Sequence, residues 1–145
     1  MTESLEKLAP LLSEFQRWRN SSKSGDVSLM DYAGFVATPD TLGALVALLF
    51  PECTMHAGRY FLADKFDSHL YDSWMKKLNS QEETQKVLNH VHVSTLFQDQ
   101  NVPDDLARAC ADVIRDAWSV SLRSLGVHAE SGGTSLDDAY ITFYG

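Results

Sequence analysis

Two histidines at alternate positions are the residues in this sequence best placed for chemistry. His90 and His92 lie in the run Asn89-His90-Val91-His92. On a β-strand, side chains two residues apart point to the same face, so the two imidazoles would be able to share a metal ion. On an α-helix of about 3.6 residues per turn they diverge by roughly 160°. The secondary structure of this segment therefore decides whether they can act together.

A metal site would need at least one further ligand. The remaining histidines are His56, His69 and His128, and no spacing in the sequence selects one of them or a particular carboxylate. A pair at a helix end, where one histidine caps carbonyl groups and the other is solvated, is the favoured interpretation. We therefore assign no metal ligand and no cofactor.

Charged and aromatic residues gather a little earlier in the chain, around the start of a predicted helix. Asp64 and His69 lie close in sequence to Trp74 and to several other aromatic residues. Such a mixture can line a ligand pocket, although it is also typical of the solvated side of an amphipathic helix. We take Asp64, His69 and Trp74, together with His90 and His92, as the candidate binding residues.

Nucleophilic catalysis finds little support in the sequence. The only cysteines are Cys53, in a predicted strand, and Cys110, on a predicted apolar helix face, where a thiol is normally inert packing. The chain has no GxSxG motif, and Gly132-Gly133 lacks the Lys-Ser/Thr that follows in a phosphate-binding loop. We assign no catalytic residue.

The element predicted to organise the fold is a long helix over residues 103–125. Pro103 suits the first helical position and Gly126 suits the position just after the last. Apolar or small residues recur at steps of three and four, which predicts the face that packs on the core. These residues are Leu106, Cys110, Val113, Ala117, Val120 and Ser121.

A second predicted core element runs from Pro39 to about Phe50. Thr38-Pro39-Asp40 is typical of a helix start, and Pro51 ends the helix. The segment between them has almost no polar face, so we expect it to be buried on all sides.

Periodicity and capping residues predict the rest of the fold. We expect a helix over residues 3–20 that either kinks at Pro10 or has a regular part beginning only at Ala9 or Pro10. Further helices are expected over 28–36, 67–78 and 81 to about 92, although residues 91–97 also alternate like a strand. Hairpins are predicted at about residues 53–63, turning at Ala57-Gly58, and 127–144. The expected fold is a mostly helical α+β single domain, residues 1–145, with a small antiparallel sheet that the two hairpins can form together, although the sequence does not decide whether they share it.

The composition of the chain argues against some classes of binding partner and some cellular locations. The 145-residue chain has a formal net charge of -8, which opposes binding to nucleic acid or to an anionic membrane surface. The sequence shows no signal peptide and no apolar run long enough to span a bilayer, so we expect a cytoplasmic protein with reduced thiols.

The sequence favours a non-catalytic module that binds a basic protein partner or a small ligand. One alternative is a small hydrolase-like enzyme that uses His90 or His92, with or without a metal ion. Another is a self-associating structural protein, that is, a homo-oligomer.

Overall fold

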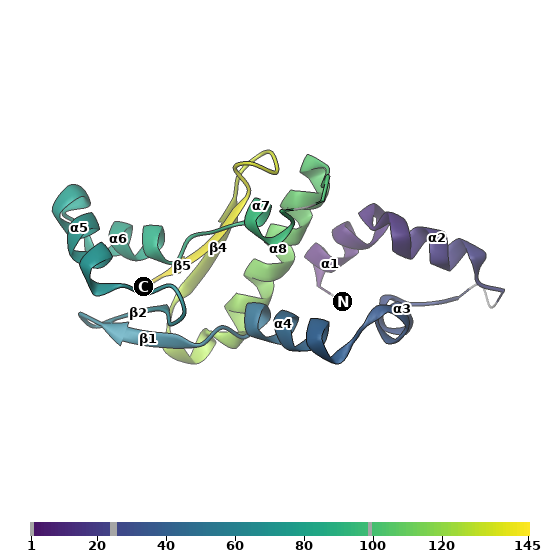
Figure 1. Cartoon of the computed structure of the whole chain (residues 1–145), viewed down its shortest axis with the longest axis horizontal. Coiled ribbons are helices and arrows are strands. Elements are labelled where there is room, and N and C mark those ends of the chain that lie inside the picture. Colours follow the sequence, from purple (N-terminus) through teal and green to yellow (C-terminus); the bar gives the residue numbers. More distant parts are fainter. Residues whose placement is uncertain (1, 24–25, 99) are drawn as a thin grey trace.

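The computed structural model describes residues 2–23, 26–98 and 100–145. It shows the predicted α+β fold, with two small antiparallel sheets. Helix α1 (Glu3–Leu8), both sheets and the helices that follow them form what we call the body. Residues 13–23 and 26–50, which we call the arm, lie between α1 and the end of α4, where the chain returns to the body (Figure 1).

Helix α8 (Asp104–Ser121) supplies more buried residues to the main hydrophobic core than any other described element, and the turn η2 (Arg123–Leu125) and Gly126, with φ 71°, follow it. The predicted inner face is wrong by one residue. The fully buried face is Ala107, Ala111, Ile114, Trp118 and Leu122, whereas Val120 is 64% exposed. Small alanines let the helix pack closely on strands β4 and β5, and this contact fixes its rotation. The predicted residues Leu106, Cys110, Val113, Ala117 and Ser121 are half-buried.

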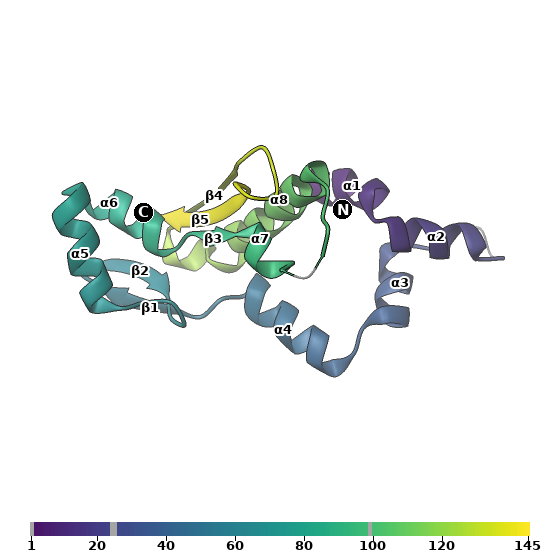
Figure 2. The ribbon, with the colours of Figure 1, turned by 45° about the horizontal axis from the view of Figure 1, so that its top comes forward.

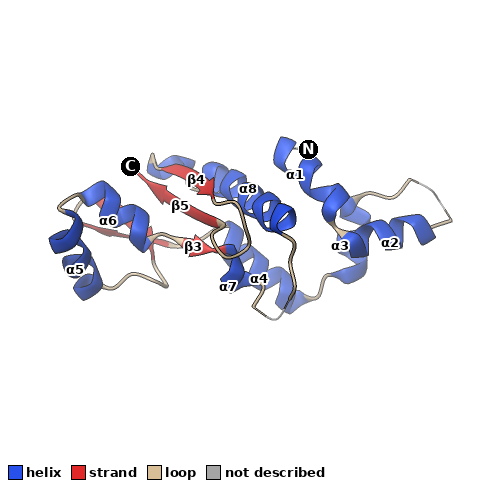
Figure 3. Ribbon diagram, turned by 90° about the horizontal axis from the view of Figure 1, so that it is seen from above, coloured by secondary structure: helices blue, strands red, loops and turns tan. Residues whose placement is uncertain are grey.

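The two predicted hairpins are present, but they lie in separate sheets. Strands β1 (Cys53–His56) and β2 (Arg59–Leu62) pair with each other through the predicted turn. The other sheet has the order β3-β5-β4, with β3 (Val91–His92), β5 (Tyr140–Tyr144) and β4 (His128–Gly132). Figure 3 shows this sheet between α6 and α8. The hairpins do not join because α6 packs on both β2 and β5.

Helices α5 (Ser68–Leu78) and α6 (Gln81–Leu88) begin where predicted, and their N-caps are Asp67 and Ser80. The predicted continuation of α6 to His92 is wrong. Asn89 ends the helix, and Val91 pairs with Ile141 in the sheet before the short helix α7 (Val93–Leu96) begins. The strand alternative therefore holds for residues 91 and 92, since a β-branched residue fits the sheet interior better than another helical turn.

Two buried amides, Gln85 of α6 and Asn89 at its C-cap, hold the hairpin to the larger sheet. The Oδ1 atom of Asn89 accepts from the Leu62 N–H at 3.0 Å, and its Nδ2 donates to the carbonyls of Tyr60 and Phe143 at 3.1 Å each. Gln85 also donates to the Tyr60 carbonyl, at 3.0 Å, and accepts from Arg59 at 2.8 Å. These bonds satisfy backbone groups that neither sheet pairs, so the sheets act as one unit.

The arm is built from three helices: α2 (Ser13–Ser21), α3 (Leu29–Val36) and α4 (Pro39–Leu49). The predicted kink near Pro10 is a break, where the turn η1 (Ala9–Leu11) and the extended Leu12 separate α1 from α2. Phe15 and Trp18 of α2 lie against Tyr32 of α3, with ring centroids 5.5 and 5.3 Å apart. Figure 2 shows α2 and α3 beyond the end of α8, away from the sheets.

Helix α4 begins at Thr38 as predicted, but its predicted burial is wrong. Leu42 is 57% exposed, Leu45 53% and Phe50 60%. Leu48 and Leu49, at its C-terminal end, pack against the core on α8. The nearly all-apolar sequence is typical of a covered helix, yet the described part of this chain covers only the C-terminal end of α4. None of the described helices combines the length and apolar character that a bilayer-spanning helix needs.

Candidate functional site

The two histidines singled out in the sequence lie side by side. His92 lies in β3 and His90 directly precedes this strand, and the centroids of their rings are 4.5 Å apart. The ring of His90 also stacks on Tyr140, at a centroid distance of 4.5 Å. An open hollow of about 380 Å³ is lined by Val87, His90 and His92. The structure thus gives the arrangement that a strand predicts and that a helix would prevent.

Burial lowers the pKa of His90 below its usual 6.5, and His92 and Lys65 add to this effect while Glu130 opposes it. The neutral imidazole is therefore favoured near neutral pH, and this is the form that binds metals or accepts protons. No group of three or more His, Cys, Asp or Glu side chains suited to a metal ion occurs within the described residues. The pair supplies two nitrogen donors without a third ligand from that part of the chain.

The other predicted binding residues are dispersed. Trp74 packs on the cluster of Phe61, Tyr71 and Leu88, with the Lys77 ammonium 4.8 Å from its ring centroid. His69 is exposed on α5, and Asp64 follows β2 at the rim of a different pocket. In the described ranges no hydrogen bond, ion pair or ring contact links Asp64, His69 or Trp74 to the histidine pair.

Neither cysteine has the surroundings of a reactive thiol. Burial raises the pKa of both Cys53 and Cys110, which lowers the share of reactive thiolate.

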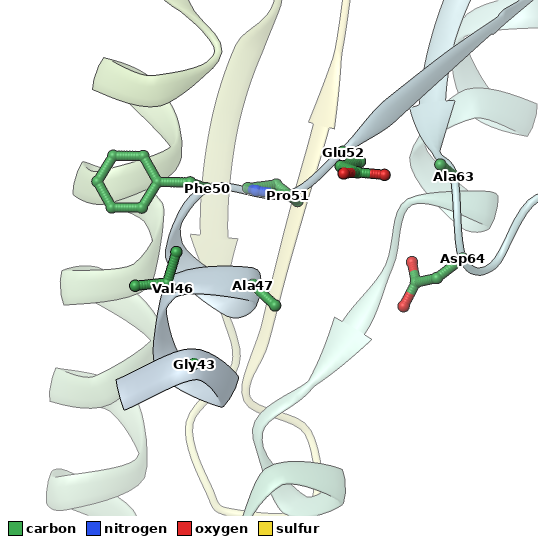
Figure 4. A pocket seen from close by; sticks show the side chains of 8 residues that line it. All are labelled: Gly43, Val46, Ala47, Phe50, Pro51, Glu52, Ala63 and Asp64. Carbon is green, nitrogen blue, oxygen red and sulfur yellow. The ribbon is translucent and has the colours of Figure 1, made fainter. Parts of the chain in front are cut away.

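Sequence reasoning missed the pockets along α4, because it placed this helix inside the core. Figure 4 shows one pocket, of about 390 Å³, in which α4 supplies a wall that includes Gly43, Val46 and Ala47. Across from this wall, Glu52 and Asp64 present their carboxylates from the segments that flank the β1–β2 hairpin. The pocket therefore has an apolar wall and an acidic rim.

A second hollow lies on another side of α4. Its volume is about 400 Å³, and its lining is almost wholly apolar, with residues from α1, α4, α7 and α8. Leu45 and Leu49 of α4 face Cys110 and Val113 of α8 across it. Helix α4 is thus incompletely covered on more than one side.

Large apolar side chains are exposed along both α3 and α4. Met30 is 81% exposed and Phe35 70%. With roughly 200 Å² for a fully exposed large side chain, the whole set leaves on the order of 800 Å² open in total, divided between one face of α4 and several sides of α3. We call this set the arm surface: Met30, Phe35, Val36, Leu42, Leu45, Val46 and Phe50.

A sequence signal for the arm surface exists. From Leu29 to Phe50 the only charged residues are Asp31 and Asp40, a run poor in charge that is suited either to a core or to an interface. The histidine pair and the arm surface are therefore the two candidate sites. Comparison of the chain with protein-family models, with curated proteins and with solved structures finds no match to any of them.

Proposed function

We propose that this protein is a non-catalytic binding module that docks another polypeptide through the arm surface. The observation that carries the proposal is the exposure of seven large apolar side chains on two consecutive helices. Exposed apolar area of this extent is unfavourable in water and becomes favourable when a partner covers it.

The shape of this surface suits a polypeptide better than a small ligand. Sites for small ligands are concave and bury most of the ligand, with a few convergent polar groups. The arm surface instead extends along two helices, and its pockets lie beside α4 and not within an enclosed cavity. A polypeptide that packs along α4 would fill these hollows and cover the exposed part of the helix at the same time.

The acidic groups beside the arm surface occupy the position that polar groups usually take at the edge of a protein interface. Glu52 and Asp64 are exposed at the rim of the pocket in Figure 4 and form no ion pair with a described residue. An apolar centre with a polar rim is the usual anatomy of a protein interface. Asp64, proposed from the sequence as a binding residue, would act at this rim.

Photo-cross-linking in cells that express the full chain tests the proposal. A photoreactive amino acid in place of Leu42, which is 57% exposed, should give discrete cross-linked polypeptides. The same amino acid in place of Leu70, 45% exposed on α5, is the matched control and should give none. Adding Val46→Glu should remove the products from position 42. If position 42 gives no product, or both positions give the same products, the proposal fails.

A hydrolase-like activity at His90 and His92 is the second candidate. The observations that favour it are the 4.5 Å separation of the two rings and the lowered pKa of His90. A panel of ester and phosphoester substrates tests it, with His90→Gln and His92→Gln as variants. Turnover that survives both substitutions, or no turnover by the parent protein, counts against this candidate.

A further inference from the structure

We infer that His90 and His92 form a binding site for a divalent transition-metal ion, with Cu²⁺ the ion held most tightly. The inference goes beyond the docking function and does not depend on it. The sequence alone selects no metal ligand, because it leaves the local structure of the two histidines open. Three observations support the site: the geometry of the two rings, the way in which His90 is held, and the hollow beside the pair.

The separation of the two rings fits two ligands of one ion. Metal–nitrogen bonds are about 2.0–2.1 Å long, so two imidazoles at neighbouring positions of one ion have ring centroids roughly 4.5–5 Å apart. The centroids of His90 and His92 are 4.5 Å apart. The short end of this range corresponds to ligands at about 90°, as in the tetragonal geometry that Cu²⁺ and Ni²⁺ prefer. Cu²⁺ also forms the strongest complexes of the divalent first-row ions.

The relative orientation of the rings also allows a shared ion. The lone pair of an imidazole nitrogen lies in the plane of its ring, so an ion bound to both rings must lie in both planes. Parallel stacked rings have no such point in common, whereas the planes of His90 and His92 are inclined at 55° and therefore intersect. No hydrogen bond to a described residue occupies a ring nitrogen of either histidine. Both imidazoles are thus available to one ion.

Tyr140 and Gly132 hold His90 in this position. The ring of Tyr140 stacks on that of His90, with an interplanar angle of 22°. Gly132 pairs with Tyr140 across β4 and β5, and a Cβ atom built on Gly132 would lie 2.6 Å from the Tyr140 ring. Gly132 has no positive φ, so this glycine serves close packing and not backbone conformation. The ring that it admits preorganises His90.

The hollow beside the pair has room for an ion together with its water ligands. Its volume is about 380 Å³, and Val87 supplies its apolar wall. An ion with two protein ligands keeps its other positions for water, which makes this an open site. Two charges act on His90 through space: the Glu130 carboxylate, which favours a cation, and the Lys65 ammonium, which opposes it.

Isothermal titration of the purified, untagged full chain with Cu²⁺ tests the inference. The tightest site should take one Cu²⁺ per chain. His90→Gln and His92→Gln should each raise the dissociation constant at least about tenfold, because only one imidazole remains. His69→Gln, at an exposed position of α5, is the matched control and should leave the constant unchanged. If the parent binds Cu²⁺ no more tightly than the double variant His90→Gln/His92→Gln, the inference is wrong.

Electron paramagnetic resonance identifies the ligands of the bound ion. The Cu²⁺-loaded parent should show splitting from two imidazole nitrogens, and each single variant should show splitting from one. A spectrum that neither substitution alters would place the ion elsewhere and overturn the inference.

Tyr140→Phe and Tyr140→Leu test how His90 is held. Phenylalanine keeps the stacked ring, so the dissociation constant for Cu²⁺ should not change. Leucine removes the ring, and the constant should rise roughly tenfold, as is common when the support of a metal ligand is lost. Circular dichroism shows whether both variants are folded. Equal constants for the two folded variants would contradict the positioning of His90 by Tyr140.

Lys65→Gln tests the location of the ion by charge. The substitution removes an exposed positive charge that acts on His90, so Cu²⁺ should bind roughly two- to fivefold more tightly, and added NaCl should reduce this gain. Lys76→Gln, the same change at an exposed position of α5, is the control and should have no effect. A constant that Lys65→Gln leaves unchanged or raises counts against a site at the histidine pair.

The metal site and the proposed functions can fail separately. Cu²⁺ binding concerns the residues beside β3, and cross-linking at position 42 concerns α4, so neither result decides the other. If the pair binds Cu²⁺ but the loaded chain turns over none of the ester and phosphoester substrates, the metal site stands and the hydrolase-like candidate fails.

Discussion

The indole N–H of Trp118 donates a hydrogen bond to the backbone carbonyl of Leu48 at a distance of 2.8 Å. Next to it, the Ser121 hydroxyl donates to the Leu49 carbonyl at 3.1 Å. The last carbonyls of a helix have no partner within the helix, so α8 supplies the partners that the end of α4 lacks. Helix α4 is thereby fixed to the body at one end, while most of its length stays open to a partner.

Replacing Trp118 should weaken this attachment. Trp118 is 1% exposed, so Trp118→Phe leaves a small cavity and removes the hydrogen bond to Leu48. We expect the free energy of unfolding to fall by about 1–3 kcal/mol. Urea denaturation followed by circular dichroism measures the change. Trp74→Phe, at a partly exposed position, is the control, and equal losses from both variants would contradict the role of this contact.

Asn89 should be among the residues on which stability depends most. Its amide makes three hydrogen bonds to backbone groups of β2 and β5 or their neighbours, and the residue is fully buried. Asn89→Ala leaves these groups unpaired, which should cost about 3 kcal/mol or more. Equilibrium unfolding of Asn89→Ala is compared with Asn101→Ala, at an exposed position. A loss of less than about 1 kcal/mol would show that water replaces the amide.

The hairpin turn offers a stabilising substitution. Ala57 has a φ of 49° and Gly58 a φ of 76°, so an alanine occupies a left-handed position that favours asparagine or glycine. Ala57→Asn should raise the free energy of unfolding by about 0.5–1 kcal/mol. Gly58→Ala should act in the opposite direction. Thermal unfolding of both variants tests this, and a lower melting temperature for Ala57→Asn would be inconsistent with the turn.

His90 should make the folded state sensitive to mild acid. Because its pKa is lowered in the folded chain, the unfolded chain binds the proton more tightly. The contribution of His90 is complete above its ordinary pKa of 6.5 and is lost as the pH falls through the lower folded pKa. His90→Phe keeps a ring against Tyr140 but cannot titrate, so its stability should decline less between pH 7 and pH 5 than that of the parent.

Urea midpoints across this pH range give the comparison, with His69→Gln as the control at an exposed position. Identical pH profiles for the parent and His90→Phe would refute the effect.

Local signals predicted the elements well. The caps at Thr38, Asp67 and Ser80 and the turn at Ala57-Gly58 all depend on residues within three or four positions of each other. Hydrogen bonds over such short spans form in nearly the same way whatever surrounds them. The α+β class followed from these elements.

The wrong predictions concern positions whose structure depends on residues far away in the sequence. The buried face of α8 depends on the strands that contact it, and residue 91 joins the sheet because Ile141 is there to pair with it. Either pattern in residues 91–97 was locally acceptable, so the sequence left the geometry of His90 and His92 open.

The apolar run of α4 shows the limit of burial predictions. Periodicity indicates that a helix will be covered, but it does not say which chain provides the cover. The apolar residues that led us to predict a buried core helix therefore lie on a helix that is largely exposed in the structure.

The packing of the arm also bears on how the folded chain opens. Helices α2 and α3 rest chiefly on each other, through Phe15, Trp18, Tyr32 and Phe35. Local opening costs little where few buried contacts are broken. Amide protons in these helices should therefore exchange with solvent long before those of α8, so the protein loosens first at α2 and α3 while α1 and the sheets remain intact.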